Sequence, residues 1–165
     1  MNLIKNKQTR RIFISWTVVV LYLALIFYFS SQDGTESHKV SAGLLQYLKV
    51  LTLVLPEYVQ NYLIKYLING NGNLEFLLRK VAHFTEYFIL SFIFYRAMIV
   101  SGSRIKKSII VTVIFCFLYA VSDEIHQLFV PGRVFAVRDI IIDTSGALLG
   151  MAIVGLKNYK KLING

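Results

Sequence analysis

Cysteine is almost absent from this chain, and charged residues are scarce. The one cysteine, Cys116, lies in the middle of an apolar run, so the chain can form neither an internal disulfide nor a thiolate metal cluster. We expect Cys116 to be an inert packing residue. Only 16% of the 165 residues are charged, whereas 56% are hydrophobic. A soluble domain of this size has too little interior to bury so much apolar surface, so part of that surface must face lipid.

The net charge of +9 does not by itself indicate a nucleic-acid-binding protein. The basic residues lie at the ends of apolar stretches and form no stripe interleaved with aromatic residues. Membrane topology explains this placement better than nucleic acid does. We therefore expect the lipid bilayer as a partner and no nucleic acid.

Long apolar stretches predict an all-α membrane protein with about four transmembrane helices, forming a single domain over residues 1–165. A stretch of about 18 helical residues rises about 27 Å, close to the roughly 30 Å of the hydrocarbon core. The first stretch follows a basic cluster and lacks a small-residue cleavage pattern, so we expect an uncleaved span rather than a signal peptide. The predicted spans are residues 12–29, 81–100, 109–129 and 139–156.

Local signals place the ends and contacts of the later spans. Ser108 is a plausible N-cap for the third span, and Pro131 and Gly132 stop it. In the fourth span, Gly146 and Gly150 have the small-xxx-small spacing that lets two helices approach closely. Helix packing explains these two glycines without any chemistry.

The segment between the first two spans predicts interfacial helices. Residues 40–55 are apolar but short, and residues 57–68 carry tyrosines and a lysine around an apolar stripe. Both pieces are expected to lie on the outer membrane surface, within the region 40–68.

The signs of the charges predict the topology. Eleven lysines and arginines fall in three segments that contain no acidic residue, namely 5–11, 96–107 and 157–161. All nine acidic residues fall in the other segments. The positive-inside rule then places both termini in the cytoplasm of a multi-pass protein of the cell membrane.

Polar residues of the last three spans are predicted to converge at the outer side. Within each span most of them are spaced three or four residues apart and therefore share a helix face. Lys80, Tyr87 and Glu124 lie beside these faces, and Arg133 lies in the turn between the last two spans. Ionisable groups at membrane depth are costly, and they are usually paired inside the bundle or line a polar cavity. The predicted ligand-binding residues are Arg79, Lys80, His83, Glu86, Tyr87, Asp123, Glu124, His126, Gln127, Arg133, Asp139 and Asp143.

These residues allow three interpretations besides ligand binding. A structural polar network would pin the helices together, at about 0.6 kcal/mol for each interhelical hydrogen bond. A metal site is not predicted, because no compact ligand motif is present, and no cofactor is expected. An enzyme would use an acid or base, with His83, Glu86, Asp123 and His126 as candidate catalytic residues. Ser30 and Ser122 are possible nucleophiles, although neither lies in a recognisable nucleophile motif.

Several segments resemble the VanZ-like family. Residues 79–87, RKVAHFTEY, resemble its K-x-x-H-F-x-E-Y segment, and residues 122–133, SDEIHQLFVPGR, resemble its S-D-E-x-H-Q-x-F-x-P-G-R segment. Residues 139–150 resemble the closing D-x-x-x-(N/D)-x-x-G-x-x-x-G segment, and residues 29–32, FSSQ, match the usual end of the first span. The resemblance covers about residues 27 to 150, in the expected order. Residues 134–136 depart from it, because many members carry small polar residues there.

The resemblance implies a cell-envelope role. VanZ itself is associated with resistance to the lipoglycopeptide teicoplanin, without remodelling of the peptidoglycan precursor. We expect a protein that binds an amphiphile, either the drug or a lipid-linked envelope precursor, at the outer leaflet and lowers teicoplanin susceptibility. In this hypothesis Arg79, Lys80 and Arg133 meet the anionic head group, while the region 40–68 covers the acyl part. The alternative is a membrane-embedded hydrolase or transferase that acts on a lipid-linked phosphate or glycan.

Overall fold

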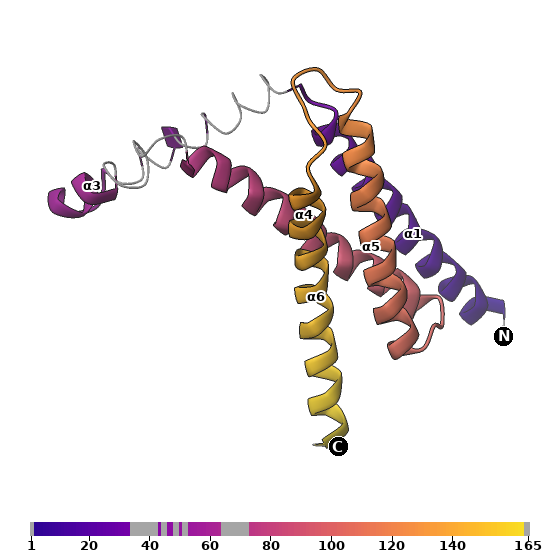
Figure 1. The fold of residues 1–165 in the computed structure, drawn as a ribbon. Coiled ribbons are helices and arrows are strands. Elements are labelled where there is room, and N and C mark those ends of the chain that lie inside the picture. The colour runs from indigo at the N-terminus through magenta and orange to yellow at the C-terminus, as the bar shows by residue number, and fades with distance from the viewer. Residues whose placement is uncertain are drawn as a thin grey trace.

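The structure is a computed structural model that describes residues 2–33, 43, 46, 47, 50, 53–63 and 73–163. These residues form helices and turns and include no strand, which confirms the all-α prediction. The helices are α1 (Asn2–Ser30), α3 (Glu57–Leu63), α4 (Asn73–Val100), α5 (Ile105–Gln127) and α6 (Val137–Ile163) (Figure 1).

Three helices of the described part are long and apolar enough to cross a membrane, against about four predicted. They cover Asn6–Ser30 in α1, Ile105–Gln127 in α5 and Val137–Asn158 in α6. Helix α4 has 28 residues and is also long enough, but it does not reach the same apolarity. His83, Glu86 and Arg96 interrupt its apolar stretch.

Each helix begins before its predicted span, because the helical backbone includes polar residues that precede the apolar run, whereas α4 ends at Val100 as predicted and α5 ends two residues before its predicted end. The prediction of Ser108 as an N-cap is wrong. Helix α5 begins at Ile105, with Arg104 in the N-cap position and no side-chain cap. The Ser108 hydroxyl instead donates to the carbonyl oxygen of Arg104, one turn back along the chain (3.0 Å). At the other end α5 stops at Gln127, shortly before the turn that contains Pro131 and Gly132.

Only part of the predicted interfacial region 40–68 is described. Residues 57–63 form the short helix α3, and Tyr58 on it is exposed. Residues 34–42 and 64–72 lie outside the described part, as do several positions between 44 and 52.

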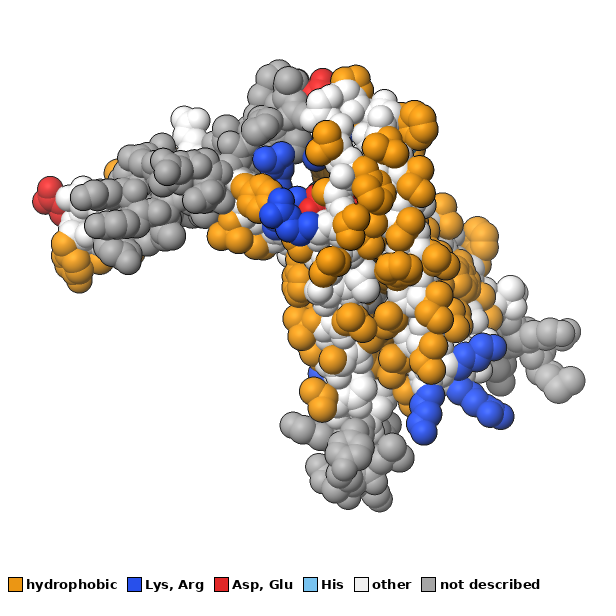
Figure 2. Space-filling view, in the orientation of Figure 1, with side chains coloured by type: hydrophobic (Ala, Val, Ile, Leu, Met, Phe, Trp, Pro, Cys, Tyr) orange, Lys and Arg blue, Asp and Glu red, His pale blue; other side chains and the backbone are white. Residues whose placement is uncertain are grey.

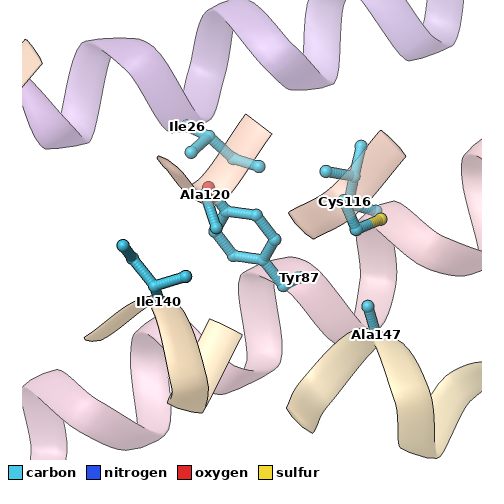
Figure 3. Close-up of a cluster of buried hydrophobic side chains, with 7 residues drawn as sticks. Ile26, Tyr87, Cys116, Ala120, Ile140 and Ala147 are labelled. Carbon is cyan, nitrogen blue, oxygen red and sulfur yellow. The ribbon is translucent and has the colours of Figure 1, made fainter. Parts of the chain in front are cut away.

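Helix α4 lies at the centre of the bundle and packs against α1, α5 and α6. Tyr87 and Leu90 on its buried face are completely inaccessible to solvent. Figure 3 shows the Tyr87 ring among apolar side chains of the three neighbouring helices, including Ile26, Cys116 and Ala147. The buried position of Cys116 agrees with its predicted packing role.

Hydrogen bonds between helices show how the helices run relative to one another. The Gln8 side chain of α1 donates to the carbonyl oxygen of Val100 (2.7 Å), and the Tyr22 hydroxyl donates to that of Glu86 (3.3 Å), so α1 and α4 are antiparallel. The Tyr119 hydroxyl of α5 donates to the carbonyl oxygen of Leu23 (2.8 Å). The N-terminal end of α1, the 101–104 turn and the C-terminal end of α6 therefore lie at one end of the bundle, and the 128–136 turn lies at the other (Figure 1).

The glycines of α6 bring this helix close to α4, as their spacing predicts. A Cβ atom on Gly146 would lie 2.2 Å from the carbonyl oxygen of Phe84. A Cβ atom on Gly150 would lie 2.2 Å from the Ser91 hydroxyl and 3.3 Å from the carbonyl oxygen of Phe88. The backbones thus meet where side chains would separate them.

Candidate functional site

A pocket of about 200 Å³ opens at the end of the bundle that contains the 128–136 turn. Its walls are the first turns of α4, the 128–136 turn, the last residue of α5 and the start of α6. In Figure 2 basic side chains gather around a hollow in this part of the molecule, with acidic side chains deeper inside. The lining residues are Phe76, Arg79, Lys80, His83, Gln127, Gly132, Arg133, Val134, Ala136, Arg138 and Asp139.

The aromatic ring of Phe76 contacts two of the basic side chains, Lys80 and Arg138. The ammonium group of Lys80 and the guanidinium group of Arg138 each lie 4.9 Å from the centre of the Phe76 ring. Lys80 also forms an ion pair with Asp139, which joins α4 to the first turn of α6. A cation over an aromatic face is attracted by the ring quadrupole, so Phe76 fixes the positions of both cations.

The other two basic side chains differ in how they are held. Nε of Arg133 donates to the carbonyl oxygen of Gln32, at the end of α1 (3.2 Å). Burial and the nearby Arg79 lower the pKa of Arg133 from its ordinary value, although a guanidinium group stays protonated at neutral pH. Nε of Arg79 is buried and has no hydrogen-bond partner among the described residues. Among the described residues, one guanidinium donor at the pocket, Nε of Arg79, is thus left without a partner.

A second group of polar side chains lies below the pocket, between the helices. Nδ1 of His83 lies 3.4 Å from a carboxylate oxygen of Asp143, whose side chain is 0% exposed. Neither oxygen of Asp143 accepts a hydrogen bond from the described residues. Glu86 and Asp123 lie within electrostatic range of the same pair. His83 thus connects the basic pocket to a buried cluster of carboxyl groups.

The structure does not bring all of the predicted residues to the pocket. Nε2 of His126 lies 3.1 Å from the Ser31 hydroxyl, and its ring lies 4.3 Å from that of Phe27, so His126 belongs to the contact between α1 and α5. Glu124 is fully buried and accepts a hydrogen bond from the backbone N–H of Ala136 (2.8 Å), just before α6 begins. Tyr87 lies in the apolar core. The predicted residues that line the pocket are Arg79, Lys80, His83, Gln127, Arg133 and Asp139.

Sequence reasoning missed Phe76 and Arg138 as parts of this site. Phe76 lies one helical turn before Arg79 and Lys80, so helix periodicity could have drawn attention to it. Arg138 directly precedes Asp139, and helix periodicity gives no signal for adjacent residues. It also missed the role of the end of α1. The Ser30 hydroxyl accepts a hydrogen bond from Gln127 (3.1 Å), next to the Gln32 carbonyl that holds Arg133.

Within the described residues, no group of three or more histidine, cysteine, aspartate or glutamate side chains is arranged to hold a metal ion. The described residues offer a basic pocket above a histidine–carboxylate pair. Such an arrangement can bind an anion, and it can hold or move a proton at His83.

Membrane-length apolar helices enclosing a charged cluster define a helical membrane protein with a polar site at one end of the bundle. Comparison with family models places it more narrowly. The chain belongs to the VanZ/LLP1 family, whose model matches residues 13–158. This confirms the resemblance identified from the motifs and extends it over nearly the whole chain. We found no match to the chain among curated proteins or among solved structures.

Proposed function

We propose that the protein binds an anionic amphiphile at the outer surface of the cell membrane and thereby lowers susceptibility to teicoplanin. The charge of the pocket carries this proposal. Its lining contains four basic side chains, Arg79, Lys80, Arg133 and Arg138, against the single carboxylate of Asp139. A site with such an excess of positive charge favours an anionic ligand.

The proposal requires the pocket to face outward, with α4 as a fourth span. Helix α4 lies alongside α1, α5 and α6, and Tyr87 and Leu90 on it are buried inside the bundle. Polar residues are tolerated in a membrane helix when they face the bundle interior, as His83 does towards Asp143. The basic segments at the opposite end of the bundle support a cytoplasmic location for both termini.

Cysteine labelling in intact cells tests this topology. With Cys116→Ala as the background, a membrane-impermeant maleimide is expected to label Phe129→Cys without permeabilisation, because Phe129 is 79% exposed in the outer turn. Arg104→Cys, exposed in the turn at the other end, is expected to react only after permeabilisation. The opposite pattern would show that the pocket faces the cytoplasm.

Drug susceptibility tests the function. Expression of the protein in a susceptible host is expected to raise the inhibitory concentration of teicoplanin by a larger factor than that of vancomycin, because only teicoplanin carries a lipid tail. The double variant Arg79→Gln/Arg133→Gln should lose this difference, because it removes two of the four pocket cations. Arg104→Gln, expressed to the same level, is the matched control at the far end of the bundle. Equal shifts for both drugs, or none, would reject the teicoplanin role.

A second candidate function is hydrolysis or group transfer on a lipid-linked phosphate or glycan. The observation that favours it is the His83–Asp143 pair, because a carboxylate beside Nδ1 leaves Nε2 as the nitrogen available to the pocket. His126 is a weaker candidate base, since it contacts Ser31 and Phe27 away from the pocket. Turnover of a labelled envelope lipid by the wild-type protein, lost in His83→Ala, would favour this activity over binding alone.

A further inference from the structure

The charge balance of the pocket limits the charge of its ligand. Lys80 and Asp139 neutralise each other as an ion pair, which leaves Arg79, Arg133 and Arg138. Three positive charges in a partly buried site repel one another, and unpaired charges are costly to bury. The pKa of Arg133 is lowered, with burial as the larger cause and Arg79 as the second, while the carboxyl groups of Asp123, Glu124 and Asp139 oppose this shift. A ligand with one negative charge would leave most of the repulsion in place.

The geometry of the donors limits the shape of the ligand. The three guanidinium groups come from three separate segments: Arg79 from α4, Arg133 from the 128–136 turn and Arg138 from the start of α6. Two of them are held by the protein, since Arg133 donates to Gln32 and Arg138 lies over Phe76. Planar guanidinium forks match the oxygens of phosphate, and a phosphate presents more acceptor oxygens than a carboxylate. An anion that bridges three such groups therefore needs several oxygens.

The volume of the pocket and the apolar side chains in its wall limit which part of the ligand it can enclose. About 200 Å³ is below the roughly 300–1,000 Å³ of pockets that hold drug-sized ligands, so the pocket encloses a head group and not a chain. Val134 in the wall is 77% exposed, and Phe76 is 37% exposed. These apolar side chains at the mouth are suited to the first part of a hydrocarbon chain that continues into lipid.

We infer that the pocket binds a lipid head group that carries two or more negative charges as phosphate, which means a phosphomonoester or a diphosphate, and discriminates against singly charged and zwitterionic phospholipids. This inference rests on the proposed binding of an anionic amphiphile and narrows it to one chemical class. Arg79, whose buried Nε has no hydrogen-bond partner within the described part of the chain, is the residue that such a phosphate would satisfy.

Binding measurements on the purified full-length protein test the inference. The probes are a prenyl diphosphate, phosphatidic acid, phosphatidylglycerol and phosphatidylcholine, each titrated in detergent at one fixed pH and salt concentration. The first two are expected to bind about tenfold or more tightly than phosphatidylglycerol, as one further charge-assisted hydrogen bond would give. Inorganic diphosphate is expected to bind more weakly than prenyl diphosphate, because it lacks the chain that contacts Phe76 and Val134.

Substitutions then assign the selectivity to the guanidinium groups. Arg133→Lys keeps the charge but loses the planar fork, and it should reduce the preference for diphosphate over phosphatidylglycerol. Arg138→Gln should weaken diphosphate binding, whereas Arg104→Gln, outside the pocket, should leave it unchanged. Equal affinity for phosphatidylglycerol and diphosphate would overturn this inference but leave the proposed function standing. Binding of none of the anionic lipids would overturn both, and equal binding of free and prenyl diphosphate would show that the site takes the free anion.

Discussion

Gly146→Ala is expected to destabilise the protein strongly. The added Cβ would lie 2.2 Å from the carbonyl oxygen of Phe84 and 3.1 Å from its carbonyl carbon, and both are backbone atoms of α4. A backbone atom cannot rotate away as the end of a side chain can, so α6 must move away from α4. Overpacking of this kind costs about 1–3 kcal/mol and sometimes more. Thermal unfolding of the purified protein in detergent, followed by circular dichroism, should show a clear fall in Tm.

Gly155→Ala is the matched control for this prediction. It lies in the same helix, and a Cβ atom there would meet nothing within 4 Å. Alanine is favoured over glycine inside a helix by roughly 0.5–1 kcal/mol, so this variant should be as stable as the wild type or slightly more stable. Similar Tm values for the two variants would show that α6 does not approach α4 as closely as described. Because Phe84 follows His83, Gly146→Ala should also disturb the pocket.

His83→Ala is expected to destabilise the protein for an electrostatic reason. Asp143 has a completely buried side chain, and Nδ1 of His83 lies 3.4 Å from one of its carboxylate oxygens. Removing the partner of a buried carboxyl group leaves that group uncompensated, which costs about 1–3 kcal/mol and more when the group is charged. The double variant His83→Ala/Asp143→Ala should regain part of this loss, because it removes the group that was left unpaired.

His126→Ala is the control variant, because it removes a histidine that lies outside the pocket. It loses the contact with the Ser31 hydroxyl and should cost about 1 kcal/mol, as expected for one hydrogen bond. All variants are compared by thermal unfolding under identical detergent conditions. The single variant Asp143→Ala is measured as well. If the losses of stability in His83→Ala and Asp143→Ala add up to the loss in the double variant, the two side chains do not interact.

Much of this architecture follows from sequence periodicity. Apolar stretches of membrane length located α1, α5 and α6, and the spacing of Gly146 and Gly150 predicted a close helix contact. The steps of three and four residues between Arg79, His83 and Glu86 predicted a shared face on α4. The predictions of the helices and of the close contact are confirmed because they depend only on the helix period and on local composition.

The predictions that differ from the structure concern which neighbouring helix each polar side chain contacts. His83 and His126 looked equivalent in the sequence, yet His83 faces Asp143 on α6 whereas His126 faces Ser31 on α1. Glu124 was expected at the cavity, but its carboxylate reaches across the turn to the Ala136 N–H. Helix phase gives the direction of a side chain relative to its own helix, and only the tertiary packing gives its partner. The same limit hid the stacking of Arg138 on Phe76.

The position of the only tryptophan has a practical consequence for spectroscopy. The indole N–H of Trp16 donates to the Ser101 hydroxyl (3.0 Å), and its ring lies edge-on to Phe94 at 5.5 Å, at the end of the bundle away from the pocket. Intrinsic emission excited at the indole band therefore reports whether α1 is docked against α4, and it is insensitive to what occupies the basic pocket. The intrinsic fluorescence of Trp16 can therefore be used to follow the association of α1 with α4 in the wild-type protein without an added dye.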